Sequence, residues 1–123
     1  MDRSLAGHTI LIVEDEPLVA LDVSRNLEDA GALVLMARTL DEALSKAEEP
    51  NLSAAVLDHG LSEGDTSAVC EILKRRRIPF VLYSGYSEIS GACSKGVLVQ
   101  KPTSPAVLVM TLAGLLPGRP TAH

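Results

Sequence analysis

Five side chains able to take part in metal or phosphoryl chemistry each follow a short apolar run of this 123-residue sequence. They are Glu14 and Asp15 after HTILIV, Asp58 after LSAAVL, Ser84 after PFVLY and Lys101 after VLVQ. Carboxylates held close together repel one another, and Mg²⁺, which prefers oxygen ligands, relieves that repulsion. An aspartate can attack phosphorus and form an acyl phosphate, while a hydroxyl and an ammonium group stabilise the transferred oxygens. The residue types therefore indicate Mg²⁺-assisted phosphoryl transfer.

This chemistry requires elements that bring the five residues to one place. The apolar runs predict five strands, at 8–13, 32–37, 52–57, 79–83 and 97–100, with helix-length segments between them. Such alternation is typical of an α/β fold with a doubly wound parallel sheet and helices on both faces. Each residue alone is more often a turn, a cap or a solvated charge. Their shared place beyond the carboxyl ends of the strands favours a functional site.

Local signals bound the helices. Pro17 suits a first helical turn and Gly31 a stop, while Thr39 and Glu42 form a capping box. A third helix should start at residue 65 or 66, and the last should run from 104–105 to about 116. The basic residues at 75–77 should lie at a helix C-terminus, where cations meet the negative end of the helix dipole.

The composition, with 46% hydrophobic and 22% charged residues, is that of an ordinary globular protein. We expect one domain over 1–123, with its core at about 8–116. The net charge of −5 gives no general attraction to nucleic acid or an anionic membrane, so neither is an expected partner. We find no signal peptide and no apolar stretch of membrane-spanning length. Cys70 and Cys93 are not part of a metal-binding motif, which favours reduced thiols and a cytoplasmic location.

The sequence resembles the receiver domain of two-component response regulators from about Thr9 to Leu116. The motifs that carry the resemblance are ILIVEDEP (10–17), AAVLDHGL (54–61), FVLYSGY (80–86) and VQKP (99–102). Each motif is modest alone, and the four are highly specific in this order. The stretch PFVLYSGY also resembles receivers found beside a subset of bacterial sensor kinases, either as stand-alone domains or fused to a kinase.

The resemblance implies a flavodoxin-like strand order, 2-1-3-4-5, and a signalling role. The domain would take a phosphoryl group from a sensor histidine kinase or phosphotransfer protein. It would catalyse only its own phosphorylation and dephosphorylation, with Mg²⁺ as cofactor. The implied roles are phospho-acceptor for Asp58, direct metal ligand for Asp15, water-mediated metal ligand for Glu14, metal-binding carbonyl for Gly60, and phosphoryl contacts for Ser84 and Lys101.

The sequence departs from the receiver pattern on the side that usually signals. Leu98 stands where an aromatic residue is usual, and the segment between Ser84 and Lys101 is short and rich in glycine and serine. We therefore expect the family's fourth helix to be short or absent, with Tyr86 either a substitute aromatic or a packing residue. The final helix carries no charge between 102 and 118. It could serve for output, by self-association or by docking a kinase domain, unless Val109 and Met110 are covered locally.

Other classes of protein fit less well. A flavin-binding flavodoxin would need a phosphate-binding loop after the first strand, where this chain has acids. A phosphatase acting on small molecules would need a substrate pocket or cap that 123 residues do not encode. A DNA-binding output finds no support. The serious alternative is a pseudo-receiver scaffold that binds partners without being phosphorylated, although every acidic and basic site residue is present.

Overall fold

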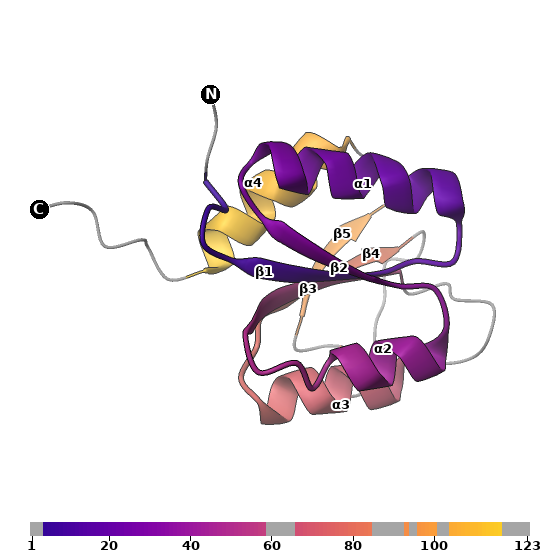
Figure 1. The fold of residues 1–123 in the computed structure, drawn as a ribbon. Coiled ribbons are helices and arrows are strands. Elements are labelled where there is room, and N and C mark those ends of the chain that lie inside the picture. The colour runs from indigo at the N-terminus through magenta and orange to yellow at the C-terminus, as the bar shows by residue number, and fades with distance from the viewer. Residues whose placement is uncertain (1–3, 59–65, 85–92, 94–95, 101–103, 117–123) are drawn as a thin grey trace, which may run out of the picture.

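Short aliphatic runs form a sheet of five parallel strands in the order β2-β1-β3-β4-β5 (Figure 1). The computed structural model describes residues 4–58, 66–84, 93, 96–100 and 104–116. The strands are β1 (Thr9–Val13), β2 (Leu33–Ala37), β3 (Leu52–Asp58), β4 (Phe80–Ser84) and β5 (Val97–Gln100). The predicted flavodoxin-like sheet and its strand order are confirmed.

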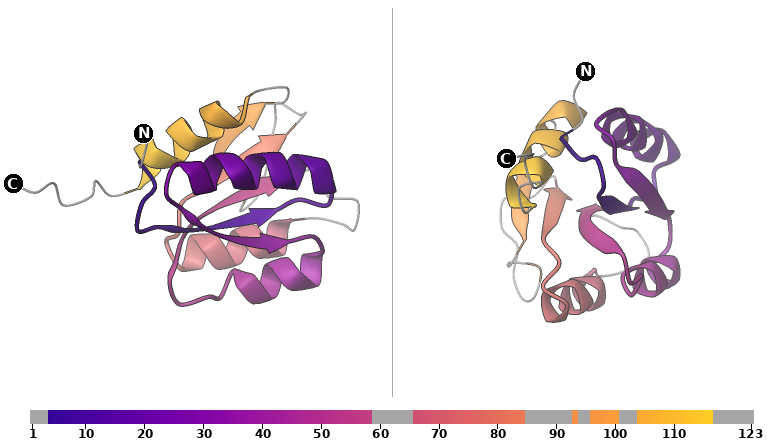
Figure 2. Two further views of the ribbon diagram at one scale, coloured as in Figure 1. Left: turned by 45° about the horizontal axis from the view of Figure 1, so that its top comes forward. Right: turned by 60° about the vertical axis from the view of Figure 1, so that its left-hand side comes forward.

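Four helices among the described residues cover the two faces of the sheet. They are α1 (Pro17–Asp29), α2 (Leu40–Lys46), α3 (Ser67–Arg75) and α4 (Pro105–Leu115). Helices α1 and α4 lie on one face, and α2 and α3 lie on the other (Figure 2). None of these helices is long and apolar enough to cross a membrane. Between β4 and β5 only Cys93 and Gly96 are described, so the expectation of a short or absent helix there falls largely outside the described residues.

The alternation of side chains along the strands divides the core into two clusters. On β1, Leu11 and Val13 belong to the cluster under α2 and α3, whereas Ile10 and Ile12 belong to the one under α1 and α4. The central strands are buried on both faces, as parallel sheets require. This burial makes β1 and β3 a fixed platform for the residues that follow them.

The boundaries of α1 follow the predicted signals. Pro17 is the first helical residue, and the Glu16 side chain accepts a hydrogen bond from the backbone N–H of Leu18 at 3.3 Å. Gly31 has φ of +99°, and a Cβ there would lie 2.9 Å from the Cα of Ala6. Only glycine fits this turn without strain.

The predicted capping box at the start of α2 is present. The Thr39 hydroxyl accepts a hydrogen bond from the Glu42 backbone N–H at 3.2 Å. The Glu42 carboxylate accepts one from the backbone N–H of Arg38 at 2.8 Å, one residue earlier than the usual partner. This backbone hydrogen bond is the main reason that the pKa of Glu42 is lowered.

The basic residues at the end of α3 connect it to α2. Arg76 donates a hydrogen bond from Nη1 to the carbonyl oxygen of Ala47, the C-cap of α2, at 2.6 Å. Arg75 forms an ion pair with Glu48 at 2.9 Å. The predicted place at a helix C-terminus is therefore confirmed: Arg75 ends α3 and Arg76 is its C-cap, and the Arg76 side chain also caps the neighbouring α2.

The outer strand β2 is covered at one point by a side chain from α2. The ammonium group of Lys46 donates a hydrogen bond to the carbonyl oxygen of Met36 at 2.6 Å. Lys46 is also the last residue of α2, where a cation is favourable. One lysine thus serves both a strand edge and a helix end.

Helix α4 has one apolar face in the core and another at the surface. Leu108, Val109 and Leu112 are buried, whereas Met110 is 72% exposed. The two residues that the sequence left undecided therefore differ: Val109 belongs to the core and Met110 to the surface. An apolar helix surface on both sides explains why periodicity alone could not separate them.

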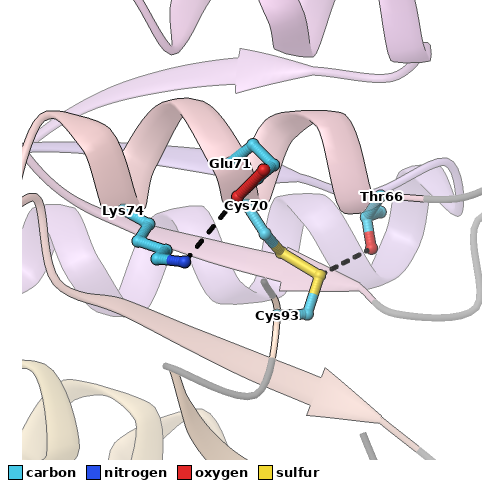
Figure 3. Close-up of a disulfide and its surroundings, with 5 residues drawn as sticks. All are labelled: Thr66, Cys70, Glu71, Lys74 and Cys93. Atoms are coloured by element: carbon cyan, nitrogen blue, oxygen red, sulfur yellow. Dashed lines mark hydrogen bonds and ion pairs between the residues drawn. A yellow bond between two sulfur atoms is a disulfide. The ribbon is translucent and has the colours of Figure 1, made fainter. Parts of the chain in front are cut away.

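The expectation of reduced thiols is wrong for this structure. Cys70 and Cys93 form a disulfide, with their Cα atoms 5.1 Å apart (Figure 3). The fold brings Cys93 into the same core cluster as Cys70 of α3, although 23 residues separate the two cysteines. Sequence spacing carries no information on such a contact.

Candidate functional site

The carboxyl ends of neighbouring strands place the acidic residues at one edge of the sheet. Asp58 is the last residue of β3, which pairs with β1 on one side and β4 on the other. Val13, the end of β1, is level with Leu57, so Glu14 follows at the level of Asp58. Convergence here is a result of strand register, as the sequence predicted.

Three carboxylates meet at this edge. Oxygen atoms of Glu14, Asp15 and Asp58 all lie within 4.8 Å of one another. Glu14 is 4% exposed and Asp58 6% exposed, while Asp15 is half-buried. Like charges with so little access to water are costly unless a cation lies between them. An all-oxygen set with one more open residue fits Mg²⁺, which keeps several of its water ligands.

Backbone hydrogen bonds fix the orientation of Glu14. Its carboxylate Oε2 accepts a hydrogen bond from the Glu16 N–H at 3.0 Å. Its own N–H donates to the carbonyl oxygen of Ala37, beyond β1 on the neighbouring β2, at 3.0 Å. Glu14 is therefore held by the start of α1 and by the end of β2, and its carboxylate is oriented before any ligand binds.

The remaining predicted site residues are described only in part. Ser84 ends β4 and pairs with Gln100 of β5, which places its backbone at the same edge as Asp58. Gly60 and Lys101 lie outside the described residues, as does Tyr86. The roles of Ser84, Gly60 and Lys101 therefore stay predictions.

An aromatic neighbour of Asp58 escaped the sequence analysis. Tyr83 is the register partner of Asp58 on β4, and it packs partly buried against the cluster under α1 and α4. The motif drew attention to Tyr86 instead. The alternation of side chains along β4 could have identified Tyr83, because paired residues on neighbouring strands project from the same face of a sheet.

Comparison with known proteins gives relatives of one kind. No protein-family model matches the chain. The phyllosphere-induced regulator PhyR of Methylorubrum extorquens is 36% identical over 104 residues, which cover 79% of this chain and 39% of that protein. The chain spans between 20% and 39% of the length of the curated relatives it matches.

Solved structures agree with the sequence relatives. The response regulator TrrA of Thermotoga maritima, determined with Mg²⁺ and BeF, has a TM-score of 0.78 and 24% identity over 89% of this chain and 99% of that chain. The response regulator PhyR of Brucella abortus has a TM-score of 0.74 and 28% identity over 92% of this chain and 49% of that chain. The first likeness concerns the fold, and the second adds a sequence likeness.

Proposed function

Because this chain belongs to the receiver domains of two-component response regulators, we propose that Asp58 accepts a phosphoryl group in an Mg²⁺-dependent reaction. The observation that carries the proposal is the cluster of three carboxylates, all within 4.8 Å, around the end of β3. The donor would be a sensor histidine kinase or a phosphotransfer protein. The proposed unit is the single domain, acting in the cytoplasm where such kinases expose their catalytic parts.

The reaction uses side chains at the ends of four strands. An oxygen of Asp58 attacks the phosphorus atom, and the bond from phosphorus to the donor's leaving atom breaks as the acyl phosphate forms. Ser84 donates a hydrogen bond to a transferred oxygen, and the ammonium group of Lys101 pairs with another. The same groups would assist attack of water on the acyl phosphate, which restores the Asp58 carboxylate and releases inorganic phosphate. The domain thus catalyses only reactions at its own aspartate.

The metal would be held by Asp15 and Asp58 directly, by the Gly60 carbonyl, and by Glu14 through water. When bound, Mg²⁺ supplies positive charge that offsets the acids and the incoming phosphoryl oxygens. Without that charge, a phosphodonor would approach two buried carboxylates and be repelled. The order of events is therefore metal first and phosphoryl group second.

Output would use α4 and the connection between β4 and β5. Met110 and Val107 are 72% and 39% exposed on a helix without charged residues. Exposed apolar area of this kind suits a protein partner. A homodimer or a kinase domain docked through α4 would cover it.

The test is exposure of the protein to acetyl phosphate and Mg²⁺, followed by intact mass measurement. One phosphate should be added to the wild type and none to Asp58→Asn. Asp22→Asn, which changes an exposed acid on α1, is the matched control and should be labelled like the wild type. Equal labelling of Asp58→Asn would refute the site assignment. Metal binding without any labelling would favour the alternative, a pseudo-receiver scaffold that binds partners without phosphorylation.

A further inference from the structure

The disulfide joins two parts of the chain that leave neighbouring strands of the site. Cys70 lies in α3, the helix that follows β3 and Asp58 along the chain. Cys93 lies in the connection that follows β4 and Ser84. The bond therefore limits how far Cys93 can move relative to α3.

Further contacts hold Cys93 in place at its backbone. Its carbonyl oxygen accepts a hydrogen bond from the Gly96 N–H at 3.1 Å. Gly96 in turn packs closely on Phe80, because a Cβ at this position would lie 2.6 Å from the Phe80 ring. Since β5 begins at Val97, a displacement of Cys93 would be transmitted to the start of β5.

The surroundings of the two sulfur atoms suit both redox states. Cys70 and Cys93 are 0% and 1% exposed, within the apolar cluster under α2 and α3. Free cysteines pack well in such a core. Thr66, the N-cap of α3, makes no side-chain capping hydrogen bond, and its hydroxyl lies 3.7 Å from the Cys93 sulfur (Figure 3). A hydroxyl there can donate to a Cys93 thiolate when the bond opens, which makes Cys93 the better leaving group.

We propose that Cys70 and Cys93 form a reversible dithiol–disulfide pair whose oxidation restrains the response of β4 and β5 to phosphorylation. The idea of restraint rests on the function proposed for Asp58 and Ser84. In reduction, a small dithiol attacks the disulfide through one thiolate, the Cys93 thiolate leaves, and a second exchange releases both protein thiols and the oxidised dithiol. In oxidation, a small-molecule disulfide accepts the two electrons and two protons and becomes two thiols. Both reagents are of classes present in a reducing cytosol, where protein disulfides are typically transient.

The burial of both sulfurs couples the exchange to the site. A reagent reaches them only when the packing around Cys70 and Cys93 opens. Opening at Cys93 would disturb the contacts of Gly96 and with them β5, whose Gln100 pairs with Ser84 at the site. By linkage, if oxidation weakens binding of a phosphoryl group by some factor, that group must favour the reduced pair by the same factor.

The experiment titrates Mg²⁺ and beryllofluoride, an analogue of the phosphoryl group, into fully oxidised and fully reduced protein. We expect the reduced form to bind the analogue about fivefold more tightly, a typical coupling factor between two sites. In the second arm, the fraction of alkylatable thiols is measured against the ratio of reduced to oxidised dithiothreitol. The midpoint ratio should shift by the same factor when the analogue is present. Asp58→Asn should keep the thiol transition and lose the shift.

Two outcomes would overturn the proposal while leaving phosphorylation at Asp58 intact. One is equal affinity of the oxidised and reduced forms for the analogue. The other is a disulfide that persists at every dithiol concentration, or thiols that never pair. Cys70→Ala/Cys93→Ala is the matched control and should bind alike in both buffers; if it does not fold, the wild-type arms still decide. Absence of analogue binding in every form would instead contradict the function proposed for Asp58, and the thiol transition would then test reversibility alone.

Discussion

Two halves of the sheet, β1 with β3 and β4 with β5, differ in the residues that they bring to the shared carboxyl edge. On the side of β1 and β3, two nearly buried carboxylates and a half-buried one meet within 4.8 Å, and a backbone N–H orients the carboxylate of Glu14. On the side of β4 and β5, Leu98 packs where receivers usually carry an aromatic residue, and a disulfide holds the connection between the strands. The first side keeps the family pattern, whereas the second keeps Ser84 and Lys101 but departs from the pattern at Leu98.

This difference indicates that reaction and response place separate demands on the chain. Under the proposed function, the carboxylate geometry has to match an ion and a phosphorus atom, so few residue types would serve there. The proposed response side would have to match a partner, and many apolar surfaces can do so. Changes on the two sides should therefore have distinguishable effects.

Replacement of Lys101 should have the largest effect and tests the division into a reaction side and a response side. Lys101 follows β5, on the response side, yet it would act on the phosphoryl group. Lys101→Ala should slow phosphorylation by acetyl phosphate about a hundredfold, the usual cost of removing a group that stabilises developing charge. The free energy of unfolding without phosphate should stay within about 0.5 kcal/mol of the wild type. Mass-detected rates and thermal melts measure the two effects. Destabilisation by several kcal/mol would make Lys101 a structural residue instead.

Replacement of Asp15 tests whether the carboxylate cluster on the side of β1 and β3 binds the metal. Asp15→Ala should lower the Mg²⁺ affinity about tenfold or more, or about 1.4 kcal/mol, because it removes a direct ligand. Calorimetric titration measures this change. Glu42→Gln is a matched control, since Glu42 is an acid that follows the neighbouring strand β2 but lies outside the carboxylate cluster. An unchanged titration of Asp15→Ala would contradict the metal assignment.

A charge at Met110 would test whether the response side is an interface. Met110→Glu should shift a concentration-dependent dimer toward monomer, or weaken kinase binding, because a charge buried in an apolar contact is costly. Light scattering across a concentration series measures the shift. Leu33→Glu is the control, because Leu33 is 64% exposed on β2 at the other edge of the sheet. If Met110→Glu leaves association and partner binding intact in a folded domain, α4 is not the interface.

The capping box of α2 should show the smallest effect, since it lies outside the site. Thr39→Ala should cost about 1 kcal/mol of stability, the typical loss of a helix N-cap. Glu42 has a pKa lowered in the folded state from its ordinary 4.5, so its contribution is present above that value and is lost as the pH falls through the folded pKa. Urea unfolding of Glu42→Gln and wild type should differ at neutral pH and converge in acid. A constant difference would contradict this origin.

Most of the fold was predictable because its local signals agree with its packing. The apolar run before Asp58 gave β3, and Pro17 and Gly31 gave the ends of α1. The edge shared by Glu14, Asp15 and Asp58 also followed, because parallel strands end on the same side of a sheet.

Two features could not be predicted, for different physical reasons. The pairing of Cys70 with Cys93 depends on tertiary contact between α3 and a distant connection, which no local pattern encodes. The sequence could not distinguish the buried Val109 from the exposed Met110, because α4 is apolar all round and its periodicity does not mark an inner face.

The hydrogen bond from Lys46 to the Met36 carbonyl has a consequence for colloidal behaviour. β2 is an uncharged outer strand, LVLMA, and Leu33 at its start is 64% exposed. An unpaired strand edge of this kind is a template for cross-β aggregation between molecules. The Lys46 ammonium occupies one backbone acceptor of β2 and brings a positive charge to it. We therefore expect Lys46 to oppose aggregation through this edge, independently of any part that the domain plays in signalling.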